Sequence, residues 1–242
     1  AGRTVAIPLA EYDMPTDFSA PAEVDILYQD DALIAVRKPA PLQVHPSPSA
    51  PRGADTLEGR VQSYLRGGAH PVHRLDAETT GIVLFAKLPY VQAHIQRQMQ
   101  ADTFRKEYLA LVCGVLPESE GVIDAPIDRV APDSFTRAVL PGGQRAVTRY
   151  RVEAALRDIS LVRLFPVTGR THQLRVHMAH IGHPLLGDTR YFTAESANLA
   201  AQYHAPYHQL CAVKLSLILP ITGKTLEIAC TPDFSVDILF HL

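Results

Sequence analysis

The chain has 242 residues, and its 23 Lys and Arg against 25 Asp and Glu give a formal net charge of −2. No strong global field therefore attracts polyanions, and any nucleic-acid binding must come from a local basic surface. The content of 47% hydrophobic and 20% charged residues is ordinary for a globular protein and excludes general disorder. The widely spaced Cys113, Cys211 and Cys230 form neither a disulfide framework nor a metal knuckle, which fits a reducing cytoplasm.

The start of the chain differs in character from the rest. Residues 1–22 carry several prolines and acidic residues, and we expect an extended lead-in there. A globular pattern begins at Glu23 and continues through residue 242. No apolar run approaches the ~20 residues that cross a bilayer, and no segment resembles a signal peptide. We therefore expect a cytoplasmic protein whose catalytic or binding domain spans residues 23–242.

Three segments have the pattern of helices. The first is predicted to begin at Asp55, because Glu58 stands three residues later at the capping-box spacing, and to end at Gly67. The second begins at Pro89, a residue favoured in the first turn, and repeats apolar residues every four positions. The third covers residues 173–181, with Thr171 as a candidate N-cap.

Strands outnumber these helices and often follow one another directly. This order predicts an α+β domain with a mainly antiparallel mixed sheet and flanking helices. A doubly wound fold would need regular strand–helix alternation, and the chain contains neither G-x-G-x-x-G nor a P-loop. The predicted strands cover residues 24–28, 33–36, 81–87, 106–112, 146–152, 160–165, 214–219 and 225–229.

The densest group of polar residues, HRLDAETTG at 73–81, stands immediately before the apolar run that begins at Ile82. A loop that enters a buried strand can hold polar side chains rigidly. From composition alone, a hydrogen-bonded turn in which Asp76 caps nearby amides is the favoured interpretation, because such loops are common.

A second group, TGRTHQLRVHMAHIGHP at 168–184, places Arg170, His172 and Arg175 near the start of a helix. The helix dipole is already positive there, so cations need an anion opposite them. That anion could be a substrate phosphate or a carboxylate from elsewhere in the fold, and the alternative is a solvated surface.

Two other enzyme classes receive little support. The histidines of the second group invite a zinc site, but their spacing does not place them on one helical face, and no H-E-x-x-H or nearby Cys completes a ligand set. A serine hydrolase lacks its G-x-S-x-G elbow. The histidines in question are His172, His177, His180 and His183.

A third segment, RKEYLALV at 105–112, reads as a strand. On a strand, Tyr108 points to the same face as Ala110 and Val112. Taken alone, this pattern favours a core tyrosine whose hydroxyl reaches the edge of the core.

Together these segments resemble the RluA-type pseudouridine synthase family. HRLDAETTGIVLFAK at 73–87 matches its aspartate motif, and RKEYLALV resembles its tyrosine motif. VRKPAPLQVHP at 36–46 and TGRTHQLRVHMAHIGHPLLGD at 168–188 resemble its lysine-proline and arginine motifs. The sequence departs from the family at Thr80, where Ser is usual, and around Lys38, where Arg37 and Ala40 replace the usual Asn and Gly.

The resemblance implies a pseudouridine synthase fold with a central RNA-binding cleft and isomerisation of uridine in RNA to pseudouridine. No cofactor and no metal are implied. Asp76 would be the essential carboxylate, which either attacks the anomeric carbon or removes a sugar proton. Arg175 would be the neighbouring cation that keeps it charged, and Tyr108 would pack against the target base and assist deprotonation at carbon five.

The same resemblance implies roles in RNA binding. Arg74 matches the arginine that holds the gap left by a flipped base, since a guanidinium can both stack and bind phosphate. Lys38 and Arg170 are expected to contact phosphate, His172 to lie among the RNA-binding residues, and His73 to be a neighbouring contact or a structural residue.

The expected substrate is ribosomal large-subunit RNA, with transfer RNA second, and the expected state is a monomer. A catalytically silent RNA-binding or ribosome-assembly protein with the same fold is the alternative. In this family a small RNA-binding domain often precedes the catalytic part. Residues 2–9 resemble the last strand of such a domain, so the lead-in is expected to be the end of a missing domain.

Overall fold

The computed structural model describes residues 23–47, 50–51, 53–101 and 103–234. The predicted lead-in at residues 1–22 lies outside them, so that prediction stays untested. The helices are α1 (Leu57–Leu65), α2 (Pro89–Gln100), α3 (Gln173–His180) and α4 (Ala194–Gln202). The strands are β1 (Asp25–Gln29), β2 (Leu33–Lys38), β3 (His70–Pro71), β4 (Thr80–Ala86), β5 (Arg105–Cys113), β6 (Glu120–Asp124), β7 (Ile127–Arg129), β8 (Arg137–Val139), β9 (Val147–Leu156), β10 (Ile159–Pro166), β11 (Leu210–Ile218) and β12 (Thr225–Ala229).

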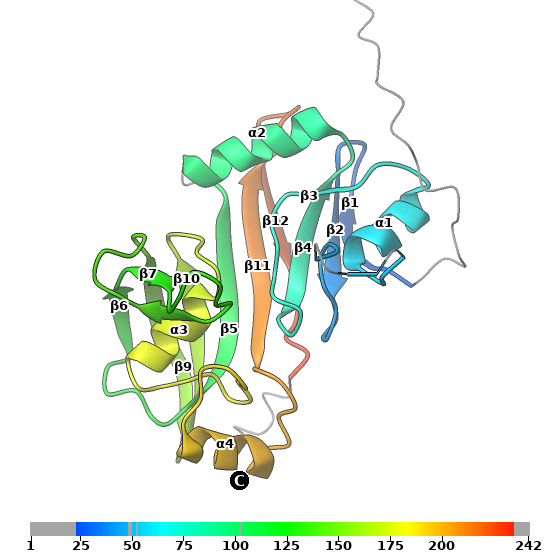
Figure 1. Cartoon of the computed structure of the whole chain (residues 1–242). Helices are drawn as coiled ribbons and strands as arrows, with labels where there is room; N and C mark the ends of the chain where they lie inside the picture. Colours follow the sequence, from blue (N-terminus) through cyan, green and yellow to red (C-terminus); the bar gives the residue numbers. More distant parts are fainter. Residues whose placement is uncertain (1–22, 48–49, 52, 102, 235–242) are drawn as a thin grey trace, which may run out of the picture.

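One ten-stranded sheet forms the centre of the molecule (Figure 1). Its order is β1-β2-β4-β11-β5-β10-β9-β6, with β3 also paired to β4 and β12 to β11. The pairs are antiparallel except for β4 with β11, which run parallel. The predicted α+β class with a mainly antiparallel sheet is confirmed. The hairpin of β7 and β8 stands apart as a second, two-stranded sheet.

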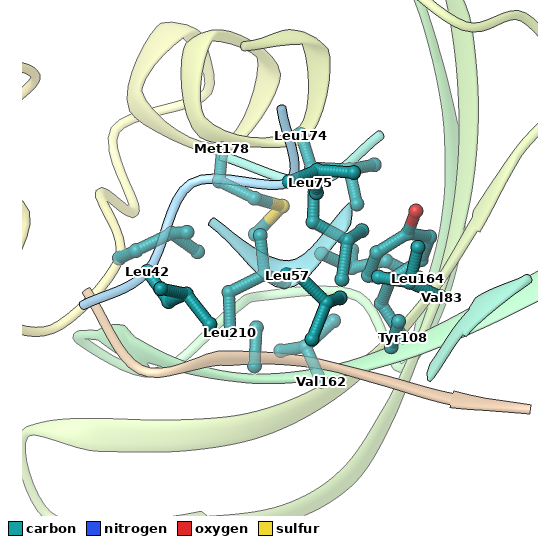
Figure 2. Packing of buried hydrophobic residues seen from close by; sticks show 14 of the residues in the cluster. Leu42, Leu57, Leu75, Val83, Tyr108, Val162, Leu164, Leu174, Met178 and Leu210 are labelled. Atoms are coloured by element: carbon teal, nitrogen blue, oxygen red, sulfur yellow. The ribbon is translucent and has the colours of Figure 1, made fainter. Parts of the chain in front are cut away.

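Helices cover both faces of this sheet. Leu57 of α1 and Met178 of α3 pack on one face in a single core cluster, shown in Figure 2. On the opposite face, Ile95 of α2 packs over the β4 and β11 end of the sheet, and Leu199 of α4 packs against the core beneath β5 and β10. None of the described helices is long and apolar enough to cross a membrane.

Three predicted helix boundaries are wrong in detail. The N-cap of α1 is Thr56, whose hydroxyl accepts the Gly59 N–H at 3.2 Å, while Asp55 instead binds the Arg60 guanidinium. The left-handed residue that ends α1 is Arg66, one position before the predicted glycine. At α3 the N-cap is His172, with φ +56° and no side-chain cap, because its ring is held by tertiary contacts described below.

The two halves of the sheet meet where β4 joins β11. Thr80 lies opposite Cys211 and Gly81 opposite Ala212. Gly81 has φ +103°, and a Cβ at this position would stand 2.3 Å from the carbonyl oxygen of Ala212. Only glycine permits this approach, since it tolerates positive φ and has no side chain. The loop that precedes β4, residues 72–79, is thereby brought over the centre of the sheet.

Gly81→Ala should destabilise the fold by at least about 2 kcal/mol, because the new methyl adds a backbone clash to an unfavourable φ. Denaturant unfolding followed by circular dichroism measures this. The matched control is Gly142→Ala, which has a similar positive φ of +83° but open space around it. It should lose only about 1 kcal/mol from strain. Equal losses in the two variants would contradict the role given to the β4–β11 contact.

Candidate active site

Asp76 lies in the loop between β3 and β4 with 24% of its side chain exposed. Its Oδ2 atom accepts a hydrogen bond from Nη1 of Arg175 at 3.1 Å, and its Oδ1 atom has no hydrogen bond with any described residue. The nearby amide of Thr79 donates to the backbone carbonyl of Asp76 and leaves the carboxylate alone. The local-capping interpretation of Asp76 is therefore wrong for the described loop, and one carboxylate oxygen is available to a ligand.

Arg175 holds that carboxylate from the first turns of α3. Its Nε and Nη2 atoms donate to the two oxygens of Asp188 at 2.7 and 2.8 Å, while Nη1 turns to Asp76. The side chains of Arg175 and Asp188 are 7% and 0% exposed. Asp188 also accepts the backbone N–H groups of Arg190 and Tyr191. The anion needed at the start of α3 is thus a pair of carboxylates, and bidentate pairing fixes the plane of the guanidinium.

The charges of this group reinforce one another. Burial opposes ionisation of Arg175, but hydrogen bonds to Asp188 and the charges of both carboxylates outweigh it and raise the pKa of Arg175. Burial likewise acts to raise the pKa of Asp188, yet the hydrogen bonds and charge of Arg175 hold that pKa below its ordinary value. The Tyr191 ring completes the enclosure, with its centroid 5.1 Å from the guanidinium carbon.

His172 lies beside the same carboxylate. Its Nδ1 atom contacts the Tyr191 hydroxyl at 2.7 Å, and that hydroxyl already accepts the Arg137 N–H at 3.0 Å. The Nε2 atom of His172 lies 3.8 Å from Oδ2 of Asp76. Burial lowers the pKa of His172 to about 4 against the attraction of Asp76, so the ring is neutral at pH 7.

Gln173 fixes the loop that leads into α3. Its side-chain oxygen accepts the Thr168 hydroxyl at 2.7 Å and the Arg170 N–H at 2.9 Å. Its amide nitrogen donates to the Val147 carbonyl and the Thr148 hydroxyl on β9. The exposed Arg170 side chain is thereby held at the rim of the site, where it donates to the carbonyl of Arg145 and the side chain of Gln144.

Tyr108 on β5 approaches from the sheet. Its ring is buried in the main core cluster, and Figure 2 shows its hydroxyl oxygen pointing away from the neighbouring hydrocarbon side chains. Burial, followed by the charge of Asp76, raises the pKa of Tyr108 above its ordinary value of 10. The phenol therefore keeps its proton at neutral pH. Tyr108 is therefore a core tyrosine that also lines the pocket beside Asp76.

Asp76 stands where two hollows meet. The inner pocket, about 290 Å³, extends toward Tyr108 and Leu210, and the outer hollow, about 430 Å³, extends toward His45 and Phe135. A larger groove of about 850 Å³ continues from the inner pocket past Lys106. The exposed Arg74 lines both the inner pocket and the outer hollow. The residues common to these two are Arg74, Leu75, Asp76, His172 and Arg175.

The predicted phosphate contact by Lys38 is wrong. Lys38 is 0% exposed, and its Nζ donates to the carbonyls of Pro39, Leu42 and Ala77 at 2.9, 2.8 and 2.7 Å. Its ammonium group thus ties the loop after β2 to the residue that follows Asp76. Burial lowers the pKa of Lys38 to about 8, with the charge of Asp76 opposing the change.

His73 is likewise structural and does not line either hollow. Its Nε2 accepts the Leu84 N–H at 3.3 Å, and its ring meets Phe104 edge-on at 5.7 Å between centroids. Burial, assisted by the charge of Lys106, lowers the pKa of His73 to about 3. Of the two roles left open for this residue, the structure supports the structural one.

Three of the four histidines considered for a zinc site make hydrogen-bonding contacts within the fold. Within the described residues no group of three or more His, Cys, Asp or Glu side chains is placed to hold a metal ion. His177 contacts the Thr148 hydroxyl and the Ala125 carbonyl through its two nitrogens, and His183 contacts the Cys113 carbonyl. These histidines serve as hydrogen-bonding groups of the fold.

Residues 32–180 match the RNA pseudouridylate synthase family. The chain belongs to this family. It is 37% identical to ribosomal large subunit pseudouridine synthase D of Haemophilus influenzae, over 96% of this chain and 75% of that protein. The Vibrio parahaemolyticus protein of the same name is 39% identical over 87% and 68% of the two chains. The solved structure of human RNA pseudouridylate synthase domain containing 1 superposes with a TM-score of 0.72 at 26% identity, over 91% and 88% of the chains. The expected family and fold are confirmed.

Asp188→Asn should destabilise this pseudouridine synthase by about 3 kcal/mol or more, because it leaves the buried Arg175 with one carboxylate instead of two. Denaturant unfolding at pH 7 gives this value. Asp158→Asn serves as the control, because it alters a partly buried hydrogen bond from Tyr203 and none of the contacts of Arg175. It should cost about 1 kcal/mol. A loss of under 1 kcal/mol in Asp188→Asn would contradict the role of Asp188 as the anchor of Arg175.

Lowering the pH should begin to destabilise the protein at pH values well above those at which its carboxyl groups take up protons. The pKa of His73 is about 3 in the folded protein and about 6.5 in the unfolded chain, so protons favour unfolding. This stabilisation is complete above pH 6.5 and is lost as the pH falls toward 3, by up to about 1.4 kcal/mol per pH unit. His73→Gln, which retains a hydrogen-bond acceptor for Leu84, should show a shallower decline between pH 6.5 and 5. Parallel profiles of variant and wild type would refute this assignment.

Proposed function

We propose that this protein isomerises specific uridines of large-subunit ribosomal RNA to pseudouridine. Its family membership supports the reaction, and the names of its bacterial relatives support the substrate. The observation that carries the proposal is the placement of Asp76, with one oxygen held by Arg175 and the other unbonded beside the Tyr108 pocket.

Asp76 acts at the ribose of the target nucleotide. The bond between N1 of uracil and C1′ breaks, the uracil turns, and a bond between its C5 and C1′ forms. C5 then loses its proton and N1 gains one, directly or by exchange with solvent. Asp76 either bonds to C1′ and is then displaced, or takes and returns a sugar proton. Atoms balance within the substrate, so the reaction needs no cofactor, and we propose that a monomer suffices.

Arg175 keeps Asp76 reactive because its charge is divided. The guanidinium carries one positive charge and contacts two carboxylates, so the three groups together keep a net charge of −1. If Arg175 paired with Asp76 alone, it would hold the Asp76 carboxylate more strongly in its resting position. With Asp188 taking two of the three hydrogen bonds, Arg175 orients Asp76 and leaves its free oxygen nucleophilic or basic.

The pockets around Asp76 contain side chains that could contact the target base and its neighbouring phosphates. We propose that the uracil enters the inner pocket and packs against Tyr108, which remains protonated and offers its ring as a wall. A flipped nucleotide costs a few kcal/mol of stacking. The exposed Arg74, which lines both hollows, can recover part of this cost by stacking in the vacated space, and the exposed Arg170, which lines the inner pocket, can contact phosphate.

Asp76→Asn should abolish pseudouridine formation, by at least roughly 10³-fold, while RNA affinity and thermal stability stay near wild type. Stability is kept because Asn is nearly isosteric and Arg175 retains its bidentate partner Asp188. The measurement is single-turnover modification of unmodified large-subunit rRNA, read by carbodiimide labelling and primer extension. Asp31→Asn, at an exposed turn of β1 and β2, is the control with full activity. Turnover in Asp76→Asn would defeat the assignment.

Pseudouridine mapping in cells with and without the gene tests the substrate. Loss of sites confined to large-subunit rRNA would support the proposal, and loss confined to transfer RNA would overturn the substrate while keeping the reaction. An unchanged map together with an inactive purified protein would favour the silent RNA-binding alternative.

A further inference from the structure

Phe135 stands at the turn of the β7–β8 hairpin and lines the outer hollow beside Asp76. It is 81% exposed, which makes it the most exposed large hydrophobic side chain among the described residues. Isolated apolar side chains at a surface need no explanation, but this one borders the reactive carboxylate. An aromatic ring held open at such a place is suited to a partner with a flat face.

The hairpin that carries Phe135 packs against α3, the helix that carries Arg175. Ile127 of β7 packs with Val176 of α3 in a small core cluster, one residue from Arg175. The Arg137 N–H of β8 donates to the Tyr191 hydroxyl, and Tyr191 stacks on the Arg175 guanidinium. Hydrogen bonds across the turn, from Val130 N–H to the Thr136 carbonyl and from Ser134 N–H to the Ala131 carbonyl, hold the tip. The ring is thus presented at a set position relative to Asp76.

The outer hollow presents two exposed guanidinium groups that could contact phosphate. Arg74 and Arg190 are exposed there, and the side chain of neither forms an ion pair with a described carboxylate. The acidic residues of the hollow lie on its other side, where Asp76 contacts Arg175 and Glu78 lies 3.2 Å from Nδ1 of His208. Two unpaired guanidinium groups beside an exposed aromatic ring are the combination that binds a phosphate and a base together.

We propose that the outer hollow is a second nucleotide site, in which Phe135 stacks on the base next to the target uridine while Arg190 contacts its phosphate. This inference rests on the proposed function, because it requires the target uridine in the inner pocket. Asp76 at the junction of both hollows then faces the ribose from which the strand continues outward. Phe135 would select RNAs whose neighbouring base is already unstacked, as in a loop.

The test uses the purified full chain and a synthetic fragment of large-subunit rRNA that carries a uridine mapped as above. Phe135→Ala and Phe135→Leu should each raise KM for this RNA roughly 10-fold, with kcat within twofold of wild type, because base stacking is lost. Phe135→Trp should restore the wild-type KM. Tyr90→Ala is the matched control, since Tyr90 is 67% exposed on α2 and lines none of the hollows.

Abasic substrates locate the contact. When the base on one side of the target is removed, the KM of wild type should rise to that of Phe135→Ala, and Phe135→Ala should lose nothing more. Arg190→Gln should reduce the slope of log affinity against log salt by about 1. A Phe135→Ala variant that matches Tyr90→Ala, a Phe135→Leu variant with wild-type KM, or an effect that persists with either neighbouring base removed would overturn the site. Inactivity of wild type on every RNA tested would instead refute the proposed function.

Discussion

The site depends on one guanidinium shared by two carboxylates. Arg175 is almost fully buried, and a buried cation is stable only if its charge and all its donors are satisfied. Asp188, itself inaccessible, supplies most of that satisfaction and is in turn held by two backbone N–H groups. The third donor is left to meet Asp76. Asp76, the proposed reactive carboxylate, is therefore positioned by an ion pair that exists without it, and we expect its reaction to leave the stability of the fold intact.

This arrangement also requires two distant parts of the sheet to meet at close range. Asp76 belongs to the loop before β4, and Arg175 follows β10, and 99 residues separate them. The parallel pairing of β4 with β11 at Gly81 brings the first part against the second. The buried ammonium of Lys38 binds the Ala77 carbonyl and so secures the Asp76 loop from the other side. Gly81 and Lys38 thus both hold the Asp76 loop in place from outside the ion-pair group.

Much of this could be predicted from the sequence, because strand alternation and the polar blocks are local signals. The class of fold and the positions of eight strands followed from these local signals, and the family resemblance pointed to Asp76, Tyr108 and Arg175 as site residues. The sequence reasoning missed strands β3, β6, β7 and β8 and helix α4. It also misjudged Lys38, since a lysine in a polar loop is ordinarily exposed and only tertiary packing surrounds it with three carbonyls. Asp188 is the last residue of the arginine motif, but its ion pair with Arg175 could not be predicted from the sequence. That contact depends on how the chain turns after α3.

The position of Tyr191 shows why such contacts escape local patterns. Its ring lies on Arg175, and its hydroxyl joins Arg137 of the hairpin to His172 at the start of α3. One side chain therefore links the guanidinium, the neutral histidine beside Asp76 and the hairpin that presents Phe135. The position of the His172 ring is therefore coupled to that of the hairpin through the Tyr191 hydroxyl. RNA bound at the outer hollow would contact the same hairpin. The side chains around Asp76 and the proposed binding site for the flanking nucleotide are therefore connected through Tyr191.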